Sequence, residues 1–572
     1  MEEIKISGEW NIENKKYKGD IHILKNKKMI RLLLYYIDEE DPFWSEDTFP
    51  ESIDVIYGIS YLDNIPITLL DCTTLRKNTY WASGRTTILI DCKYCIYNLL
   101  FKKAEKVTFN KLRVRLTNSL EWSELYGFSS SLKNITKKKP INIKYQFKNI
   151  VQYKISDNIK VEFIPVLGKH EHVMKSEKVI FEQYMVVELT YKRVENFKNI
   201  MSNLNQIIQL IEMSTNLKVE IAQIEGFKNS SFYKIHQINK RVLNPYRIYY
   251  SKEEESDFNN IELIKRDNKF ICDLKSIVEV DGLDNWFKKY EDLKPIIELY
   301  NKKFEYDIGE EQEFLNVVQA LEFYHTRFVV EDLKEYKQRI EEKCKKQPKL
   351  LEYIFDKTQN DTSYIILRNR LIDLILNSNI LSFFNRGINF IYFAQSITDT
   401  RHYYTHYNIS KKYKALQGTE LSIVTVILNT LLEYYLLKEL GFDRQYLEKN
   451  TKNRLIRIRK VVIPYDEQRY IELYKRVNLV TSVKNISKNI CKKYQLGNYI
   501  NEKIIIDNEQ DLFFYLETDK KKVKVRIFNV RRSDDECNEI REQDRNFLIY
   551  TKKHLYELIY FYERYRIIIY KK

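Results

Sequence analysis

The sequence predicts an α+β multidomain protein with a β-rich amino-terminal domain, a mixed middle region, an all-helical four-helix bundle and a small α+β carboxy-terminal region. Two periodicities support this class. Apolar and polar residues alternate over short stretches early in the chain, whereas apolar residues recur every three or four positions over 310–442. A chain of 572 residues has room for roughly three or four domains. We expect them at 1–150, 151–305, 306–445 and 446–572.

Short alternating segments between turn residues predict strands from residue 4 to about 125. The clearest are DIHILKNKKMIRLLLYYI, IDVIYGISYL, PITLLDCTTL, RTTILID and KVTFNKLRVRL. In the middle region, IKVEFIPVLG and QYMVVELTY predict further strands. The period then lengthens, so VENFKNIMSNLNQIIQLIEMST and LDNWFKKYEDLKPIIELYN are predicted helices.

Four amphipathic segments predict the helical bundle. Their apolar stripes are Phe314, Val317, Val318, Leu321, His325 and Phe328; Tyr364, Leu367, Leu371, Leu374 and Ile375; Phe384, Ile388, Ile391 and Gln395; and Leu421, Val424, Leu428, Leu431, Leu432 and Tyr435. Gly441 stands where a helix C-cap is expected. Short connections make a four-helix bundle the simplest arrangement.

The carboxy-terminal region has a different pattern. DLFFYLETDKKKVKVRIFNV predicts a hairpin whose second strand carries Lys522, Lys524 and Arg526 on one face. We assign Lys524 and Arg526 as candidate RNA contacts, although such a face is more often simply solvated. KKHLYELIYFYERY predicts a last helix and RIIIY a last strand.

Composition limits the function classes. A formal charge of +15 favours a nucleic-acid partner, because Lys and Arg that neutralise phosphates release counterions. Lysine, isoleucine and asparagine are abundant everywhere, however, which also fits a coding bias. With 13 glycines, the chain contains neither G-x-x-x-x-G-K nor G-x-G-x-x-G. A nucleotide-driven motor or a Rossmann dehydrogenase is therefore disfavoured.

Cysteine and histidine usage predicts no metal and no cofactor. The seven cysteines are odd in number and scattered, which favours a reducing cytoplasm over a disulfide framework. Cys92 and Cys95 form a C-x-x-C without a second pair, inside a segment that alternates like a strand. His170 and His172 lack a third ligand nearby, so we expect a solvated turn there.

The amino terminus and the apolar windows predict no membrane partner. The amino terminus lacks the basic, apolar and small-residue order of a secretory signal. The longest apolar window, LSIVTVILNTLL, is shorter than the roughly 20 residues of a membrane span. We therefore expect a soluble cytoplasmic protein.

The segment SITDTRHYYTHYN, residues 396–408, is the strongest candidate for an active site. The apolar line of the third helix, through Ala394 and Ile397, leads to Arg401. Burying an arginine requires an anionic partner or ligand. His406 follows five positions later, which in a continuous helix is roughly 140° of rotation and about 7.5 Å of rise. One chain's pair would converge poorly, so two chains about a two-fold axis would have to share one cleft.

Such a cleft could cleave RNA through its own 2′-hydroxyl, without a metal, to give a 2′,3′-cyclic phosphate and a 5′-hydroxyl. His406 would transfer the proton, and Arg401 would stabilise charge on the phosphorane oxygens. His402 could orient the arginine or a phosphate. Unpaired bases could stack on Tyr403, Tyr404 and Tyr407. From the residues alone, a capped helix end with locally satisfied polar groups stays an alternative.

DTRHYYTHYN resembles the R-x4-6-H signature of the HEPN ribonucleases, with His402 where many members carry Asn or Asp. The wider chain, over residues 4–445, resembles the ApeA-like HEPN family of anti-phage abortive-infection proteins. The stretches that carry the resemblance are GEWN with Gly19, ITLLDC, VTFNKLRVRLTNSLEW, NWF, VVQALEFYHTRF and LLEYYLLKELGF. Residues 450–572 are not matched to the family.

The resemblance implies a cytoplasmic bacterial endoribonuclease that stays quiet until infection and then cleaves host or phage RNA. Single-stranded or loop RNA, tRNA included, is the expected substrate, and the β-rich domain would sense a phage-derived trigger or restrain the enzyme. A homodimer through the bundle is expected. Glu322 and His325 are either supporting residues of the site or satisfied polar groups of the core. A non-catalytic HEPN scaffold that binds RNA or protein, and a toxin with a separate antitoxin, are the alternative functions.

Overall fold

The chain divides into two compact units in the computed structural model. The first comprises residues 1–291, 304–306 and 439–442, and the second comprises 292–303, 307–438 and 443–572. The structure describes residues 3–13, 15–24, 28–37, 49–80, 85–130, 143–171, 180–235, 240–251, 270–305, 308–345, 349–378, 380, 390–407, 415–455, 498–506, 512–519, 522–529 and 565–571. The domain boundaries expected from the sequence stay predictions.

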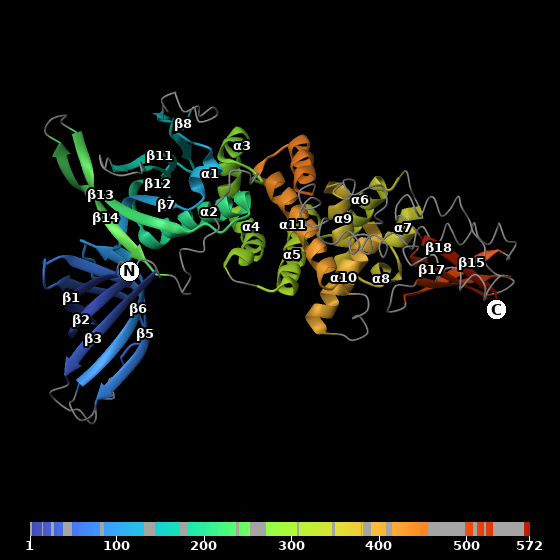
Figure 1. Ribbon diagram of the computed structural model, residues 1–572, viewed down its shortest axis with the longest axis horizontal. Helices are drawn as coiled ribbons and strands as arrows, with labels where there is room; N and C mark the ends of the chain where they lie inside the picture. The colour runs from blue at the N-terminus through green and yellow to red at the C-terminus, as the bar shows by residue number, and fades with distance from the viewer. Residues whose placement is uncertain are drawn as a thin grey trace, which may run out of the picture. The chain divides into compact units, whose positions relative to one another are not determined.

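A closed antiparallel barrel begins the first unit (Figure 1, blue). Its strands are β1 (Glu3–Ile12), β2 (Lys15–Leu24), β3 (Met29–Ile37), β4 (Ser52–Ser60), β5 (Pro66–Tyr80) and β6 (Arg85–Tyr97). They lie in the order β6-β3-β2-β1-β4-β5, and β5 pairs again with β6, which closes the barrel. Closure leaves no unpaired strand edge in this ring. The strands predicted in this part of the sequence are confirmed.

The barrel strands approach each other so closely at Gly19 that no side chain fits there. Trp10 has no exposed surface, and its indole N–H donates to the Gly19 carbonyl at 3.0 Å. Gly19 lies opposite Gly8 across the β1–β2 ladder. A Cβ on Gly19 would collide with the carbonyl oxygen of Leu33, which belongs to a paired strand and has little freedom to move. Glycine at position 19 is therefore required by the close approach of β2 and β3.

The C-x-x-C motif lies inside the barrel wall, as the strand prediction required. Cys92 and Cys95 are both buried in β6, and Cys72 lies opposite Cys92 on β5. Burial raises the pKa of the Cys95 thiol well above its ordinary value, because the thiolate would be desolvated. Among the described residues, no group of three or more His, Cys, Asp or Glu side chains could hold a metal ion.

A second run of strands continues from the barrel in the order β14-β13-β7-β12-β11-β10. These are β7 (Thr108–Leu116), β10 (Val151–Lys154), β11 (Ile159–Glu171), β12 (Ile180–Asn196), β13 (Ile221–Ile235) and β14 (Lys240–Tyr250). β14 pairs with β6 and so links the two parts of the sheet. β13 and β14 were not among the strands named from the sequence, whereas the predicted β7, β11 and β12 are confirmed.

Helices and short elements complete the first unit. They are η2 (Ala104–Lys106), α1 (Ser119–Ser123), β8 (Phe128–Ser130), β9 (Ile143–Tyr145), α2 (Phe197–Thr215), α3 (Leu274–Glu279) and the first part of α4 (Gly282–Glu305). The predicted α2 packs on β7 and β12 with Phe197, Ile200 and Leu204 buried. His170 pairs with Phe181 in the β11–β12 ladder, so the solvated turn expected at this position is wrong. His172 lies outside the described residues.

The second unit is helical over most of its described length. Its helices after α4 are α5 (Glu310–Tyr324), η5 (His325–Val329), α6 (Leu333–Lys343), α7 (Lys349–Ile354), α8 (Lys357–Asn360), α9 (Leu367–Ser378), α10 (Phe390–His406) and α11 (Thr419–Leu440). The predicted amphipathic segments correspond to α5, α9, α10 and α11, and α5, α9 and α10 pack on one another. Their arrangement as a four-helix bundle stays a prediction.

Most of the predicted apolar stripes are buried, with one clear error. Tyr364 is 62% exposed and precedes α9, which begins at Leu367, while its neighbour Ile365 is buried. The helical count had been extended one turn too far toward the amino terminus. Phe384 and Ile388 lie outside the described residues. Gly441 follows α11 with a φ of +102°, which confirms the predicted C-cap.

The apolar helix α11 is longer than the window LSIVTVILNTLL indicated. Among the described residues, Glu420–Leu440 is the one helix with the length and apolar composition to cross a membrane. However, 83% of its apolar window is buried inside the protein. Helices that are apolar all round are also found in the cores of large proteins, and the burial of α11 has this character.

The end of the chain adds a small antiparallel sheet in the order β15-β16-β17-β18. Its strands are β15 (Tyr499–Ile506), β16 (Leu512–Thr518), β17 (Lys522–Asn529) and β18 (Tyr565–Lys571). The predicted hairpin and the predicted last strand are confirmed. The predicted helix KKHLYELIYFYERY lies outside the described residues.

We expect Gly19→Ala to lower the free energy of unfolding of the first unit by about 1–3 kcal/mol, the usual cost of overpacking. The added Cβ would meet the Leu33 carbonyl oxygen, so β2 and β3 must separate. Urea denaturation followed by tryptophan fluorescence would measure the change. The neighbouring exposed variant Lys18→Ala is the control and should unfold like the wild type. Equal stability of Gly19→Ala and Lys18→Ala would contradict the packing argument.

Candidate active site

The last turns of α10 are attached to the residues that precede α11. The Leu416 backbone N–H donates to the Thr400 hydroxyl at 2.9 Å, and the Tyr404 hydroxyl donates to the Leu416 carbonyl at 3.2 Å. Burial, aided by the negative charge of Glu311, raises the pKa of Tyr404 to about 12, so this phenol stays protonated as a donor. These two bonds hold the end of α10 in place.

A left-handed residue ends α10 immediately after the candidate histidine. Tyr407 has a φ of +47°, and its backbone N–H bonds to the Tyr403 carbonyl at 2.6 Å. This is the αL type of helix termination, here without glycine. α10 therefore runs unbroken through Arg401 and His406.

The structure places Arg401 and the two histidines on different sides of this helix end. Arg401 is half-buried, in line with the buried Ala394 and Ile397. Within the described part of the chain, no hydrogen bond or ion pair engages its guanidinium. A half-buried cation that no described residue bonds is suited to an anionic ligand.

His402 and His406 lie side by side on an exposed face. Both side chains are exposed, and their ring centroids are 6.4 Å apart with an interplanar angle of 34°. Residues four apart lie on the same face of a helix, which explains the pairing. Arg401 and His406, five apart, are rotated by roughly 140° and about 7.5 Å along the axis. One chain therefore brings together the two histidines and leaves the arginine to one side.

The three candidate tyrosines differ in their surroundings. Tyr403 contacts both others, with ring centroids 5.1 Å from Tyr404 and 6.0 Å from Tyr407. The Tyr404 hydroxyl is engaged by Leu416, so this side chain anchors the helix. Tyr407 is 70% exposed, which leaves its ring face accessible to solvent.

The other candidate RNA contacts belong to the small terminal sheet. Lys524 and Arg526 lie in β17, opposite Tyr515 and Phe513 of β16. Their backbone register is that of the predicted hairpin. Their side chains are outside what the structure describes, so their role stays a prediction.

His325 belongs to a buried polar network. It has no exposed surface, and its Nε2 lies 3.0 Å from the Oδ2 of Asp373, which is equally buried. Arg370 Nη1 lies 3.3 Å from the His325 Nδ1 and can only donate, so Nδ1 accepts and Nε2 carries the proton. The imidazole is therefore neutral in this arrangement.

The carboxylate of this network already has a cation. Lys343 Nζ bonds Asp373 Oδ1 at 2.8 Å, and the Asn377 amide donates to the same oxygen at 3.0 Å. Burial alone would raise the pKa of Asp373, but the bonds from His325 and Lys343 lower it below its ordinary value. Because Lys343 supplies the positive charge, His325 can stay neutral, and burial lowers its pKa.

The position of His325 supports its assignment to the core. Glu311, in the first turn of α5, is close enough to raise the pKa of Tyr404, whereas His325 follows the last residue of α5. A helix of 15 residues is roughly 22 Å long. His325 thus belongs to the opposite end of α5 from the end of α10. For His325, this favours a satisfied core group. Glu322 is half-buried, and its role stays a prediction. Asp373, inside the apolar stripe of α9, was the sequence signal that could have revealed the network.

A β-barrel region followed by helices, with an Arg-x4-His motif at a helix end, agrees with a protein of the HEPN class. Two family models match the chain: ApeA N-terminal domain 1 over residues 5–286, and Apea-like HEPN over residues 315–446. The chain belongs to the ApeA-like HEPN family. HEPN domains are generally nucleases, and this family points to anti-phage defence. No curated protein and no solved structure matches the chain.

We expect the second unit to lose stability as the pH falls below about 6.5, the ordinary pKa of histidine. Burial keeps His325 neutral in the folded protein, while the unfolded chain binds a proton there. The unfolded state then holds more protons, so the free energy of unfolding decreases as the pH is lowered. His325→Gln should unfold more easily at neutral pH and show a flatter slope between about pH 5 and 6.5. Chemical denaturation at stepped pH measures this. Thr405→Ala, an exposed substitution that changes no titratable group, should keep the wild-type slope, and an unchanged slope in His325→Gln would refute the assignment.

Proposed function

We propose that the protein is an anti-phage endoribonuclease that cleaves single-stranded or loop RNA without a metal, with tRNA among its candidate substrates. The observation that carries the proposal is the placement of Arg401, His402 and His406 at one helix end in a chain of the ApeA-like HEPN family. The histidines are exposed and so can reach a substrate. Arg401 is half-buried, and no anionic group of the described residues pairs with it, so it would be available for a phosphate.

In the proposed reaction the RNA supplies its own nucleophile. The 2′-oxygen attacks the adjacent phosphorus, and the bond from phosphorus to the 5′-oxygen breaks. His406 accepts the proton of the 2′-hydroxyl or donates a proton to the leaving 5′-oxygen. The guanidinium of Arg401 stabilises the charge on the phosphorane oxygens. His402, one turn from His406, orients the phosphate. The products are a 2′,3′-cyclic phosphate and a 5′-hydroxyl.

The divergence of Arg401 and His406 on one helix supports a site shared by two chains. Rotation by roughly 140° keeps one chain's pair from meeting at a single phosphate. A two-fold axis near the end of α10 would bring the arginine of one chain to the histidine of the other. We therefore propose a homodimer formed through a bundle of α5, α9, α10 and α11.

The remaining proposals concern substrate and context. Tyr403 and Tyr407 would stack unpaired bases, and Lys524 with Arg526 would contact the RNA backbone. Tyr404 would support them from its bond to Leu416. The β-rich first unit would respond to a phage-derived trigger, and the enzyme would act in the cytoplasm.

We expect cleavage of a fluorescent single-stranded RNA to persist in excess EDTA and to leave 2′,3′-cyclic phosphate ends, because histidine and arginine supply proton transfer and charge stabilisation. Sequencing of RNA ends, with and without enzymatic removal of the cyclic phosphate, identifies the product. Loss of cleavage in EDTA that Mg²⁺ or Mn²⁺ restores would contradict the metal-independent mechanism. RNA binding without cleavage, by the activated wild type, would indicate the scaffold alternative.

We expect Arg401→Ala and His406→Ala each to lose most of the cleavage activity. The cleavage rate of His406→Ala should fall by about 10²–10⁴-fold, the usual contribution of general acid–base catalysis. Mixed under conditions that exchange subunits, they should regain part of the activity, because a heterodimer holds one complete pair. The exposed neighbour Thr405→Ala is the control and should stay active. Mass photometry would confirm dimers. Dimers without recovered cleavage would rule out the shared site.

A further inference from the structure

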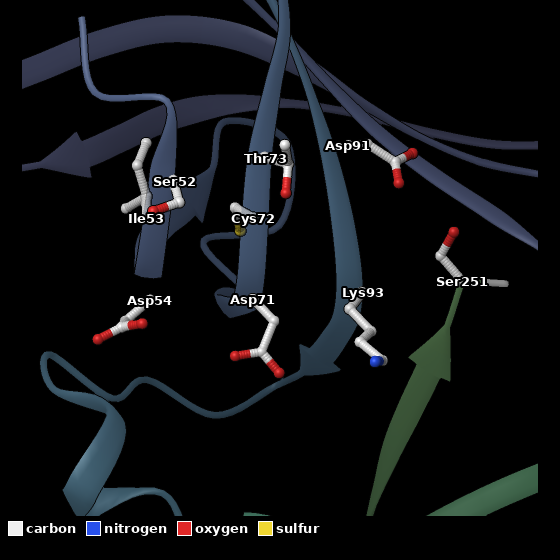
Figure 2. A pocket seen from close by; sticks show the side chains of 9 residues that line it. All are labelled: Ser52, Ile53, Asp54, Asp71, Cys72, Thr73, Asp91, Lys93 and Ser251. Atoms are coloured by element: carbon white, nitrogen blue, oxygen red, sulfur yellow. The ribbon is translucent and has the colours of Figure 1, made fainter. Parts of the chain in front are cut away.

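The barrel of the first unit carries a pocket of about 340 Å³ that the proposed nuclease activity does not use. Strands β4, β5 and β6 contribute to it, together with Ser251 immediately after β14 (Figure 2). Its volume falls within the range of roughly 300–1,000 Å³ common for small-molecule sites. Asp71 and Cys72 come from the ITLLDC stretch of the sequence.

Ser251 is a buried residue that lines the pocket. The residue is 7% exposed, and its backbone N–H donates to the Lys93 carbonyl at 2.7 Å. Its hydroxyl makes no hydrogen bond within the described residues. A hydroxyl that faces a pocket without a protein partner is free to bond water or a ligand there. Figure 2 shows that this hydroxyl is directed into the pocket.

Asp91 adds a carboxylate to the same part of the pocket. It is half-buried and makes no hydrogen bond or ion pair within the described residues. Burial raises its pKa, although Arg31, its register partner on β3, acts in the opposite direction. In Figure 2 the Asp91 carboxylate and the Ser251 hydroxyl are directed toward each other from neighbouring elements. Both oxygen groups therefore line the same pocket, and no described residue bonds either of them.

The charges of the lining favour a cation. Asp54, Asp71 and Asp91 line the pocket against a single exposed lysine, Lys93. Lys198 partly neutralises Asp71, with Nζ 3.3 Å from Oδ1. Asp54 has no ion pair among the described residues. Asp71 also has a left-handed backbone, with a φ of +50°, which is uncommon for a residue other than glycine and concentrates at functional positions.

We propose that this pocket binds a small organic ammonium compound, whose cationic nitrogen bonds the Asp91 carboxylate and the Ser251 hydroxyl. An ammonium group has three N–H donors and no acceptor, which matches two oxygen acceptors that lack donors. A divalent metal fits less well, since no group of three or more acidic, cysteine or histidine side chains in the described residues could hold one. A linear diamine would extend its second nitrogen toward Asp54 and Asp71, at the other end of the pocket in Figure 2.

The test measures binding of putrescine and spermidine to the full-length protein by isothermal titration calorimetry at low salt. The neutral isostere butane-1,4-diol and MgCl₂ serve as comparison ligands. One diamine per chain should bind to the wild type, with no binding of the diol. Asp91→Asn should weaken binding at least tenfold, and Ser251→Ala several-fold. Asp63→Asn removes an exposed carboxylate from the β4–β5 turn, outside the pocket, and should leave the affinity unchanged.

Each contrary result would overturn the proposal. Absence of amine binding to the wild type, or equal weakening by Asp91→Asn and Asp63→Asn, would mean that the pocket is not an ammonium site. Stoichiometric binding of Mg²⁺ that excludes the diamine would assign it to a metal instead. Thermal melting confirms that the variants are folded. If Asp91→Asn unfolds, Ser251→Ala decides alone, because it deletes only a hydroxyl that no described residue bonds.

Discussion

Two hydrogen bonds to Leu416 hold the end of α10, and the placement of every candidate catalytic group depends on them. Thr400 and Tyr404 bind the backbone N–H and the carbonyl of that one residue. The helix therefore continues through His406 and ends at the left-handed Tyr407. Helical geometry then separates the chemistry into two faces, with His402 and His406 exposed on one and Arg401 half-buried on another. A frayed or kinked end would give the three side chains no defined relation.

Polar side chains away from solvent fall into two groups. Some have hydrogen-bond partners within the protein, whereas others have none among the described residues and are candidate ligand contacts. His325 and Asp373 have no exposed surface, yet both are bonded, and Lys343 supplies the charge that the carboxylate needs. A satisfied network of this kind stabilises a unique packing of α5, α6 and α9. Ser251, Asp91 and Arg401 differ in that no described residue bonds their side chains. A ligand gains the most binding free energy where it bonds donors and acceptors that lack partners, at the edge of a cavity or at a helix end.

Features decided by neighbouring residues were predicted more accurately from the sequence than features decided by contacts between distant residues. Alternation in PITLLDCTTL and RTTILID predicted β5 and β6, because an element's own residues record which face is buried. Tyr364 was wrongly placed in the core because a helical count does not say where the helix begins. β13 and β14, which connect the two parts of the large sheet, were not recognised, although they pair with each other as neighbouring strands. Their ladder is interrupted by a register shift between Phe227 and Phe232, and β14 joins the barrel through the sequence-distant β6.

The features of the candidate site also differ in whether neighbouring or distant residues decide them. The sequence by itself determined the identity and spacing of Arg401, His402 and His406, the resemblance to the HEPN family, and the helical period that separates arginine from histidine. These properties are local, so adjacent residues are enough to define them. Only the tertiary structure decided that Tyr404 is an anchor bonded to Leu416, that His325 is a neutral core group bonded to Asp373, and that Ser251 and Asp91 line one pocket. Each of these depends on a partner from another element, and a contact between distant residues exists only once the chain has folded.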